Sequence, residues 1–108
     1  IKTLKNILIK YHKCFFGDSS IPLINTISKK IICNEFSDST SKEKIYSIYN
    51  FSRNEIKGKI IKLTSEVKKI SQIYGKNNNV KIIKKQNNSY LSANLNSDDL
   101  ILVNIKFK

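Results

Sequence analysis

The chain has 108 residues, 40% of them hydrophobic and 9% aromatic, which allows one domain with a modest core and excludes a globally disordered chain. Lysine and arginine number 20 against 8 acidic residues, for a formal net charge of +12. Such a charge is typical of proteins that contact nucleic acid or another anionic surface. Only Arg53 is an arginine, and an AT-rich coding bias enriches lysine, asparagine and isoleucine, so a solvated lysine-rich surface is the alternative explanation.

Residues 1–30 predict two helices. Apolar side chains recur at spacings of three and four within residues 1–16, and Gly17 is expected to end that helix in a left-handed conformation. Pro22 suits the first turn of a second helix that extends to about Lys30. The apolar stripe of the first helix consists of Ile1, Leu4, Leu8, Tyr11 and Phe15.

From residue 31 onward the pattern predicts strands. The expected elements, in order, are an apolar run at 31–33, a polar loop at 36–42, a hairpin of 45–51 and 56–63 with its turn at 52–54, a second hairpin of 80–84 and 90–95, a turn at 96–99 and a strand at 100–107. Alternation breaks phase at Ile60-Ile61, which predicts a β-bulge. Residues 65–74 fit either a short helix capped by Ser65 or a strand.

The last strand alternates, and this predicts one face on a core and one face partly in water. Its core face is expected to be Ile101, Val103, Ile105 and Phe107, matched on the neighbouring strand by Leu91, Ala93 and Leu95. Helices followed by an antiparallel β-meander of four to five strands define the α+β class, with the N-terminal amphipathic helix packed on the sheet. One domain is expected over 1–108, helical over 1–30 and mainly sheet over 31–108.

The sequence nominates no catalytic, cofactor-binding or metal-binding residue. His12 is the only histidine and has no evident partner that would orient it. Cys14 and Cys33 lie 19 positions apart and cannot complete a metal site with His12 at any usual spacing. The two cysteines therefore form either a disulfide in an exported protein or two buried thiols in a cytosolic one.

Tyrosines interleaved with lysines offer a further possibility. They are Tyr46, Tyr49, Tyr74 and Tyr90. Such residues can form a stacking platform for single-stranded nucleic acid, but in strands they more often form cross-strand core pairs.

An amphipathic helix, a variable loop region and a β-meander stand in the order found in type IV pilin-like proteins. Residues 45–50 (IYSIYN), followed by Asn54-Glu55-Ile56 and a second strand, resemble the first hairpin of minor pilins and pseudopilins. In those proteins the second strand often opens with a Leu-x-Arg-like step, whereas here Arg53 precedes the turn residue. The family's leader-peptidase site and apolar half-helix would lie before Ile1.

The resemblance implies a non-enzymatic structural subunit of a pilus or pseudopilus-like filament, serving adhesion, secretion or DNA uptake. Other pilin-like subunits would contact its N-terminal helix, and a segment upstream of Ile1 would anchor it in the membrane, at the cell surface or outside the cell. Surface lysines would add weak non-specific affinity for nucleic acid. Cys14 and Cys33 would tie the helix to the loop.

Two other functions fit the basic composition. One is a small secreted nuclease-type toxin domain acting on RNA or DNA without a metal, which requires His12, lysines and tyrosines to converge in a cleft. The other is a nucleic-acid-binding module without catalytic activity.

Overall fold

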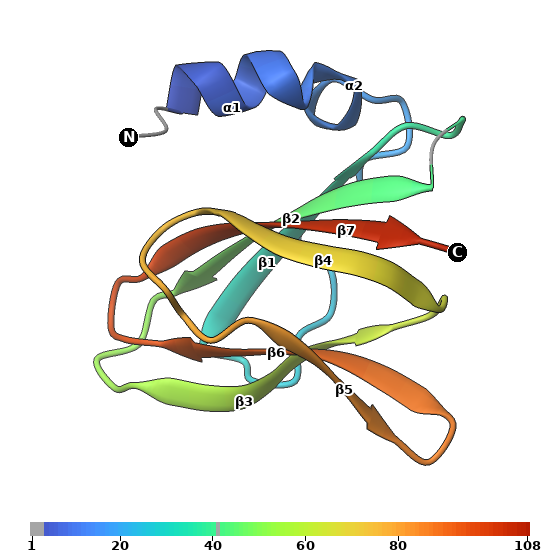
Figure 1. Cartoon of the computed structure of the whole chain (residues 1–108). Coiled ribbons are helices and arrows are strands. Elements are labelled where there is room, and N and C mark those ends of the chain that lie inside the picture. The colour runs from blue at the N-terminus through green and yellow to red at the C-terminus, as the bar shows by residue number, and fades with distance from the viewer. Residues whose placement is uncertain (1–3, 41) are drawn as a thin grey trace.

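Two antiparallel sheets and a pair of short helices make three layers in the structure, a computed structural model that describes residues 4–40 and 42–108 (Figure 1). The helices lie over one face of the first sheet, and the second sheet covers its other face. The elements are α1 (Leu4–Lys10), α2 (His12–Phe15), β1 (Ile31–Ser37), β2 (Glu43–Asn50), β3 (Ile56–Leu63), β4 (Val67–Tyr74), β5 (Lys81–Lys85), β6 (Asn88–Leu95) and β7 (Leu100–Phe107).

The expected α+β class, a long N-terminal helix on one meander, is wrong. Strands make up 51% of the structure and helices 11%. The expected first helix is interrupted at Tyr11, and no second helix forms after Pro22. Residues 21–30 are instead an irregular segment fixed by the strands beside it, because β pairing outweighed their weak helical periodicity.

The strand order explains why no simple meander forms. The four-stranded sheet has the order β1-β2-β7-β4 and the three-stranded sheet the order β3-β6-β5. The expected hairpin of 45–51 and 56–63 is therefore wrong, because β2 pairs with β1 and β7 while β3 pairs with β6. The chain crosses between the sheets from β2 to β3, from β3 to β4, from β4 to β5 and from β6 to β7.

Strand β7 lies at the centre of the molecule, and its middle residues, 101–105, are buried on both faces. One face, with Ile101, Val103 and Ile105, packs in the core between the two sheets. The other face carries Leu102, which packs beneath the helices. The expectation that this second face is partly in water holds at its ends, where Leu100 and Lys106 are exposed, while Leu102 and Asn104 between them are 7% and 5% exposed.

The second sheet supplies the other half of the main core. Leu91, Ala93 and Leu95 of β6 are fully buried there, as the alternation predicted. They face β7 across the sandwich and not from a neighbouring strand of the same sheet. The predicted bulge in β3 is confirmed by a register shift between Lys59 and Ile61, which leaves both Ile60 and Ile61 buried.

A strap of residues 18–27 closes the open side of the sandwich between β1 and β3. Backbone amides of the strap donate hydrogen bonds to backbone carbonyl oxygens at the edge of β1. The Ile21 amide donates to the Glu35 carbonyl at 2.8 Å, and the Ile24 amide donates to the Cys33 carbonyl at 2.9 Å. Its far end reaches the bulge of β3, where Ile27 donates to the Ile60 oxygen at 2.9 Å. The strap therefore covers an edge strand that would otherwise offer free backbone groups for pairing.

Candidate functional site

The outer face of the three-stranded sheet is rich in lysine. Because Leu91, Ala93 and Leu95 point into the core, the alternate residues of β6 point outward, and their cross-strand partners share that face. The register pairs Asn94 with Lys57, Ser92 with Lys59 and Lys81, Tyr90 with Lys62 and Ile83, and Asn88 with Lys85. We call this surface, formed by Lys57, Lys59, Lys62, Lys81, Lys85 and Tyr90, the lysine face.

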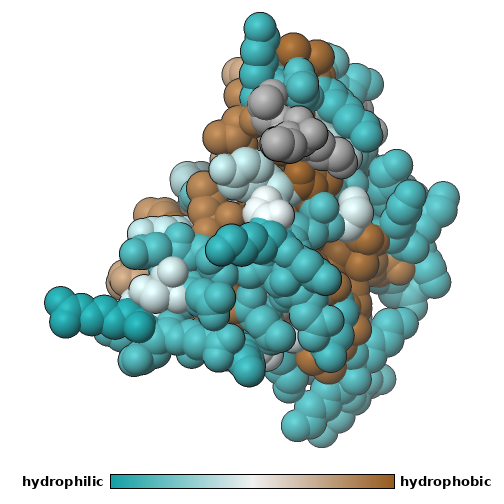
Figure 2. Space-filling view, turned by 60° about the vertical axis from the view of Figure 1, so that its left-hand side comes forward, coloured by the Kyte–Doolittle hydropathy of each residue, from teal (hydrophilic) through white to brown (hydrophobic). Residues whose placement is uncertain are grey.

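The lysine face carries an excess of positive charge. Neither β3, β5 nor β6 contains an aspartate or a glutamate, so no carboxylate of these strands neutralises the lysines. The Lys59 ammonium lies 4.5 Å from the centroid of the Tyr90 ring. The nearest carboxylate in sequence, Glu55, pairs with Lys57 at 3.5 Å at the end of the sheet. Figure 2 shows one side of the molecule, on which hydrophilic residues in teal cover most of the surface between smaller brown apolar areas.

The helices leave this face open. They lie at the opposite end of the molecule, over the four-stranded sheet (Figure 1). Among the four tyrosines considered from the sequence, Tyr90 is the one placed among outward-facing lysines of this sheet. Tyr46 is instead a core residue, 3% exposed, and Tyr49 donates from its hydroxyl to Asp98 at 2.8 Å.

A second basic region is a cleft between the helices and the four-stranded sheet. It has a volume of about 390 Å³. We call it the helix cleft; its lining residues are Lys10, Tyr11, His12, Lys13, Cys14, Glu43, Lys69, Ser71, Asn104 and Lys106. Sequence reasoning considered His12 but did not connect it with Glu43, Lys69 and Lys106, because these three residues come from strands remote in sequence. His12 Nδ1 lies 3.3 Å from the carbonyl oxygen of Ile9 in its own helix.

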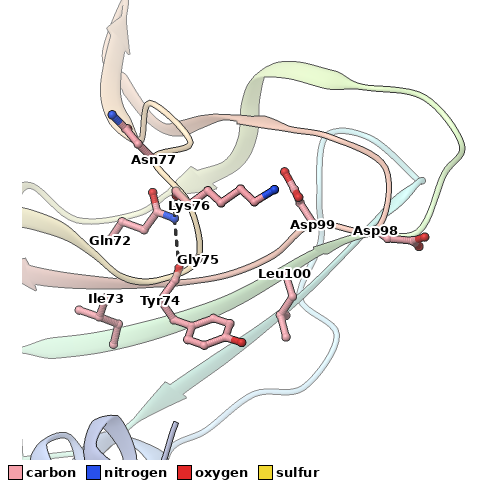
Figure 3. Close-up of a pocket in the computed structure, with 9 residues that line it drawn as sticks. All are labelled: Gln72, Ile73, Tyr74, Gly75, Lys76, Asn77, Asp98, Asp99 and Leu100. Atoms are coloured by element: carbon pink, nitrogen blue, oxygen red, sulfur yellow. Dashed lines mark hydrogen bonds between the residues drawn. The ribbon is translucent and has the colours of Figure 1, made fainter. Parts of the chain in front are cut away.

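A third depression, shown in Figure 3, lies where the β4–β5 loop meets the β6–β7 turn. Its polar groups serve the fold. The Asn78 side-chain amide donates to the backbone carbonyl oxygen of Asn94 at 2.7 Å and to the Asp99 carboxylate at 3.0 Å. The Gln72 side-chain amide donates to the side-chain oxygen of Asn78 at 3.0 Å. The Asp99 carboxylate also accepts a hydrogen bond from the backbone amide of Asn96 at 2.8 Å. Asp99 therefore binds the two loops together and is not a free carboxylate.

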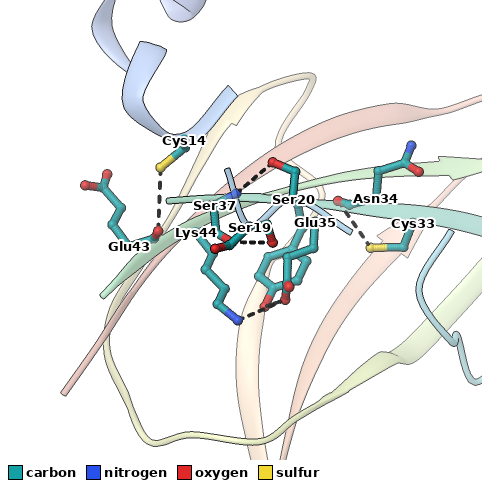
Figure 4. A network of polar contacts seen from close by, with 10 residues as sticks. Cys14, Ser19, Ser20, Cys33, Asn34, Glu35, Ser37, Glu43 and Lys44 are labelled. Carbon is teal, nitrogen blue, oxygen red and sulfur yellow. Dashed lines mark hydrogen bonds and ion pairs between the residues drawn. The ribbon is translucent and has the colours of Figure 1, made fainter. Parts of the chain in front are cut away.

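A buried polar group sits at the inner face of β1 and β2 (Figure 4). Glu35 is 8% exposed and accepts a hydrogen bond from the Tyr46 hydroxyl at 2.8 Å and from Lys44 at 3.3 Å. Burial raises the pKa of Tyr46 well above its usual value, and the charge of Glu35 raises it further. Because Tyr46 stays protonated, this arrangement stabilises the carboxylate and offers no proton for chemistry near neutral pH.

Of the two alternatives for the cysteines, a disulfide or two buried thiols, the structure shows two buried thiols. Both are free and buried, and they lie on opposite faces of the four-stranded sheet, Cys33 in the core and Cys14 under the helices. The Cys14 thiol donates to the Glu43 carbonyl oxygen at 3.6 Å (Figure 4). Burial raises the pKa of Cys14 to about 11 and that of Cys33 to about 12, with nearby carboxylates adding to both shifts. Neither thiol is suited to be a nucleophile.

No family model, curated protein or solved structure matches this chain. Among residues 4–40 and 42–108 there is no cluster of three or more histidine, cysteine or acidic side chains able to hold a metal ion. In the same residues, neither helix has the length and apolar character needed to cross a membrane.

Proposed function

We propose that this protein is a nucleic-acid-binding module without catalytic activity, and that the lysine face is its contact surface for single strands. One observation carries the proposal: five lysines and Tyr90 share one open sheet face whose strands contain no carboxylate. Such a face attracts phosphates along its whole extent, while the tyrosine ring offers a base a stacking partner.

The spacing of these side chains suits an extended strand. Residues two apart in a β-strand lie about 7 Å apart on one face, and neighbouring strands lie about 5 Å apart. The ammonium groups therefore form a grid and not a single point of charge. Lysine lacks the fixed fork of arginine, so we expect binding that depends on charge and stacking and discriminates weakly among sequences.

The proposal is tested by fluorescence anisotropy with a labelled single-stranded RNA of about 12 nucleotides, titrated between about 50 and 200 mM salt. The test variant is Lys57→Ala/Lys59→Ala/Lys81→Ala. The control, Lys29→Ala/Lys30→Ala/Lys76→Ala, removes the same charge from exposed positions outside the face. We expect the test variant to lose about tenfold in affinity and about 2 from the log–log salt slope, at roughly 0.7 per lysine.

The control variant is expected to lose less than about twofold. If both variants lose affinity equally, binding reflects net charge alone and the lysine face is not a site. A duplex of the same sequence should bind more weakly, since a stacked base pair cannot reach Tyr90.

The pilin-like function stays a prediction, together with its surface location and filament partners. The architecture expected for it, a long helix on one meander, is wrong for this chain. A second candidate, RNA cleavage, is favoured by one observation: His12 and Glu43 line the same cleft as several lysines. It predicts that the protein degrades RNA in EDTA and that His12→Ala abolishes the degradation.

A further inference from the structure

We propose that the helix cleft is a binding pocket for a phosphate dianion, either free or at the end of a nucleic-acid strand. Four lysines from separate parts of the fold and His12 converge on it: Lys10 and Lys13 from the helices, Lys69 from β4 and Lys106 from β7. This pocket shares no residue with the lysine face, so each site can exist without the other. A volume of about 390 Å³ is sufficient for a small anion.

The strand register places two of these lysines side by side. Lys69 of β4 is the direct cross-strand partner of Lys106 of β7. Like charges directly opposite each other destabilise a sheet, so the pair costs stability in the free protein. A bound anion between the two ammonium groups would remove that cost.

The carboxylate at the cleft is engaged from within the protein. Glu43 is the partner of Lys106 on the other side of β7, and its Oε1 accepts from the Asn104 amide at 2.7 Å. Glu43 is the carboxylate among the residues that line the cleft, against the four lysines, so the lining carries a positive excess.

The hydroxyl group of Ser71 adds a neutral donor to the pocket. Ser71 is the cross-strand partner of Asn104, and both residues line the cleft. This pair lies two residues along the strands from the Lys69–Lys106 pair. A hydroxyl beside an ammonium pair is a common combination for phosphate oxygens. Cys14 of α2, which also lines the cleft, belongs to the buried apolar cluster between the helices and the sheet.

The test uses inorganic phosphate as the probe, at constant ionic strength with chloride as the reference anion. Amide NMR spectra of the labelled protein should show saturable shifts confined to residues near Ser71, Asn104 and Lys106, and phosphate should raise the melting temperature. The test variant is Lys106→Ala, and Lys81→Ala on the lysine face is the matched control. Lys106→Ala should lose at least about fivefold in phosphate affinity, an expected shift of roughly 1 kcal/mol by the standard conversion.

The same variant carries an internal check on folding. Without phosphate, Lys106→Ala should stay folded and melt close to the temperature of the parent, because it loses both the repulsion from Lys69 and the attraction of Glu43 on the other side of β7. Loss of binding together with retained stability supports a site. Shifts scattered over all surface lysines, no saturation at about 10 mM phosphate, or unchanged binding by Lys106→Ala would overturn the proposal.

Two oligonucleotides separate the possible sources of the phosphate. One carries a 5′-phosphate and the other a 5′-hydroxyl, with the same sequence. Tighter binding of the phosphorylated strand that disappears in Lys106→Ala assigns the pocket to strand ends. Equal binding of both strands, with saturable binding of inorganic phosphate, assigns it to small phosphorylated compounds.

Discussion

The side-chain amide of Asn50 donates a hydrogen bond to the carbonyl oxygen of Leu95 at 3.0 Å. Asn50 ends β2 and Leu95 ends β6, so this bond joins two of the places where the chain crosses between the sheets, β2 to β3 and β6 to β7. The same amide also donates to the backbone oxygens of Asn54 and Asn96 at 2.9 and 3.2 Å. Asn50 is fully buried, and its polar atoms therefore hold both crossings in register.

Removing this side chain should cost much of the stability of the protein. Asn50→Ala leaves backbone oxygens at the crossings without their donor, and each lost buried bond costs about 1 to 3 kcal/mol. We expect the free energy of unfolding in urea to fall by about 3 kcal/mol or more. The control is Asn54→Ala, an exposed residue that contributes to this network through its backbone. A similar loss in both variants would contradict the role given to Asn50.

Both thiols should resist alkylation at pH 8 until the protein unfolds. Burial holds the pKa of Cys14 at about 11 and that of Cys33 at about 12, against an ordinary value of 9.0. Folding raises the pKa of both thiols, so below pH 9 they are neutral in the folded and the unfolded protein and ionisation does not affect stability. As the pH rises from 9 toward 11, the unfolded protein loses thiol protons that the folded protein keeps, and the free energy of unfolding falls. A disulfide reagent should react fast in urea and slowly without it. Mass measurement of an oxidised pair in the folded protein would contradict the placement of the two cysteines.

Tyr46→Phe should destabilise the protein through the partner that it leaves behind. Glu35 would keep the Lys44 ammonium at 3.3 Å but lose its shorter bond from the Tyr46 hydroxyl. A buried carboxylate that loses a donor costs about 1 to 3 kcal/mol. Glu35→Gln in the Tyr46→Phe background should recover part of that loss, because a neutral amide is cheaper to bury. Chemical denaturation of the single and double variants measures the difference, and no recovery would argue against a buried charge as the cause.

Tyr90→Ala should weaken binding of single-stranded RNA by about tenfold, since stacking of one base on an aromatic ring is worth about 1 to 3 kcal/mol. Tyr90→Phe keeps the ring and should bind as the parent does. Tyr49→Ala removes a tyrosine from the other sheet and serves as the control for general effects of losing a ring. Anisotropy titrations at one salt concentration are sufficient. Equal binding by Tyr90→Ala and Tyr90→Phe would show that the face acts through charge alone.

Gly17→Ala should destabilise the junction between the helices and β1. A Cβ at this position would lie 2.0 Å from the carbonyl oxygen of Ser37, so the backbone has to move apart. Gly58→Ala is the comparison: its added Cβ meets no atom within 4 Å, although its φ of +110° is one that alanine adopts only with strain. Thermal unfolding should show the larger loss for Gly17→Ala. A larger loss at Gly58 would mean that the close approach to Ser37 is readily relaxed.

Several local features were predictable from the residue pattern. The bulge at Ile60-Ile61 follows from a break in alternation, and the buried row Leu91, Ala93 and Leu95 follows from alternation itself. Gly17 was expected to end a helix with a left-handed conformation. The structure requires glycine at position 17 because the backbone of Ser37 lies too close for a Cβ atom. This contact joins segments about 20 residues apart, so no local pattern contains it.

The candidate sites were less predictable than the strands. Strand alternation alone places Lys57 and Lys59 on one face, but their grouping with Lys81 and Tyr90 requires the order β3-β6-β5. His12 was visible as the only histidine, whereas Lys69 and Lys106 become its neighbours through the pairing of β4 with β7 under the helices. The same pairing decided that 67–74 is a strand and not a helix.

By itself the sequence determined the positive charge, the presence of β-strands after residue 31 and which alternate residues of those strands are apolar. These properties depend on composition and on contacts between near neighbours, which a pattern records directly. Only the tertiary structure decided which strands pair, where the chain crosses between sheets and why Cys14 and Cys33 are kept apart. Those outcomes depend on burying both faces of β7 at once, and that free energy exists only when residues far apart in the chain have come together.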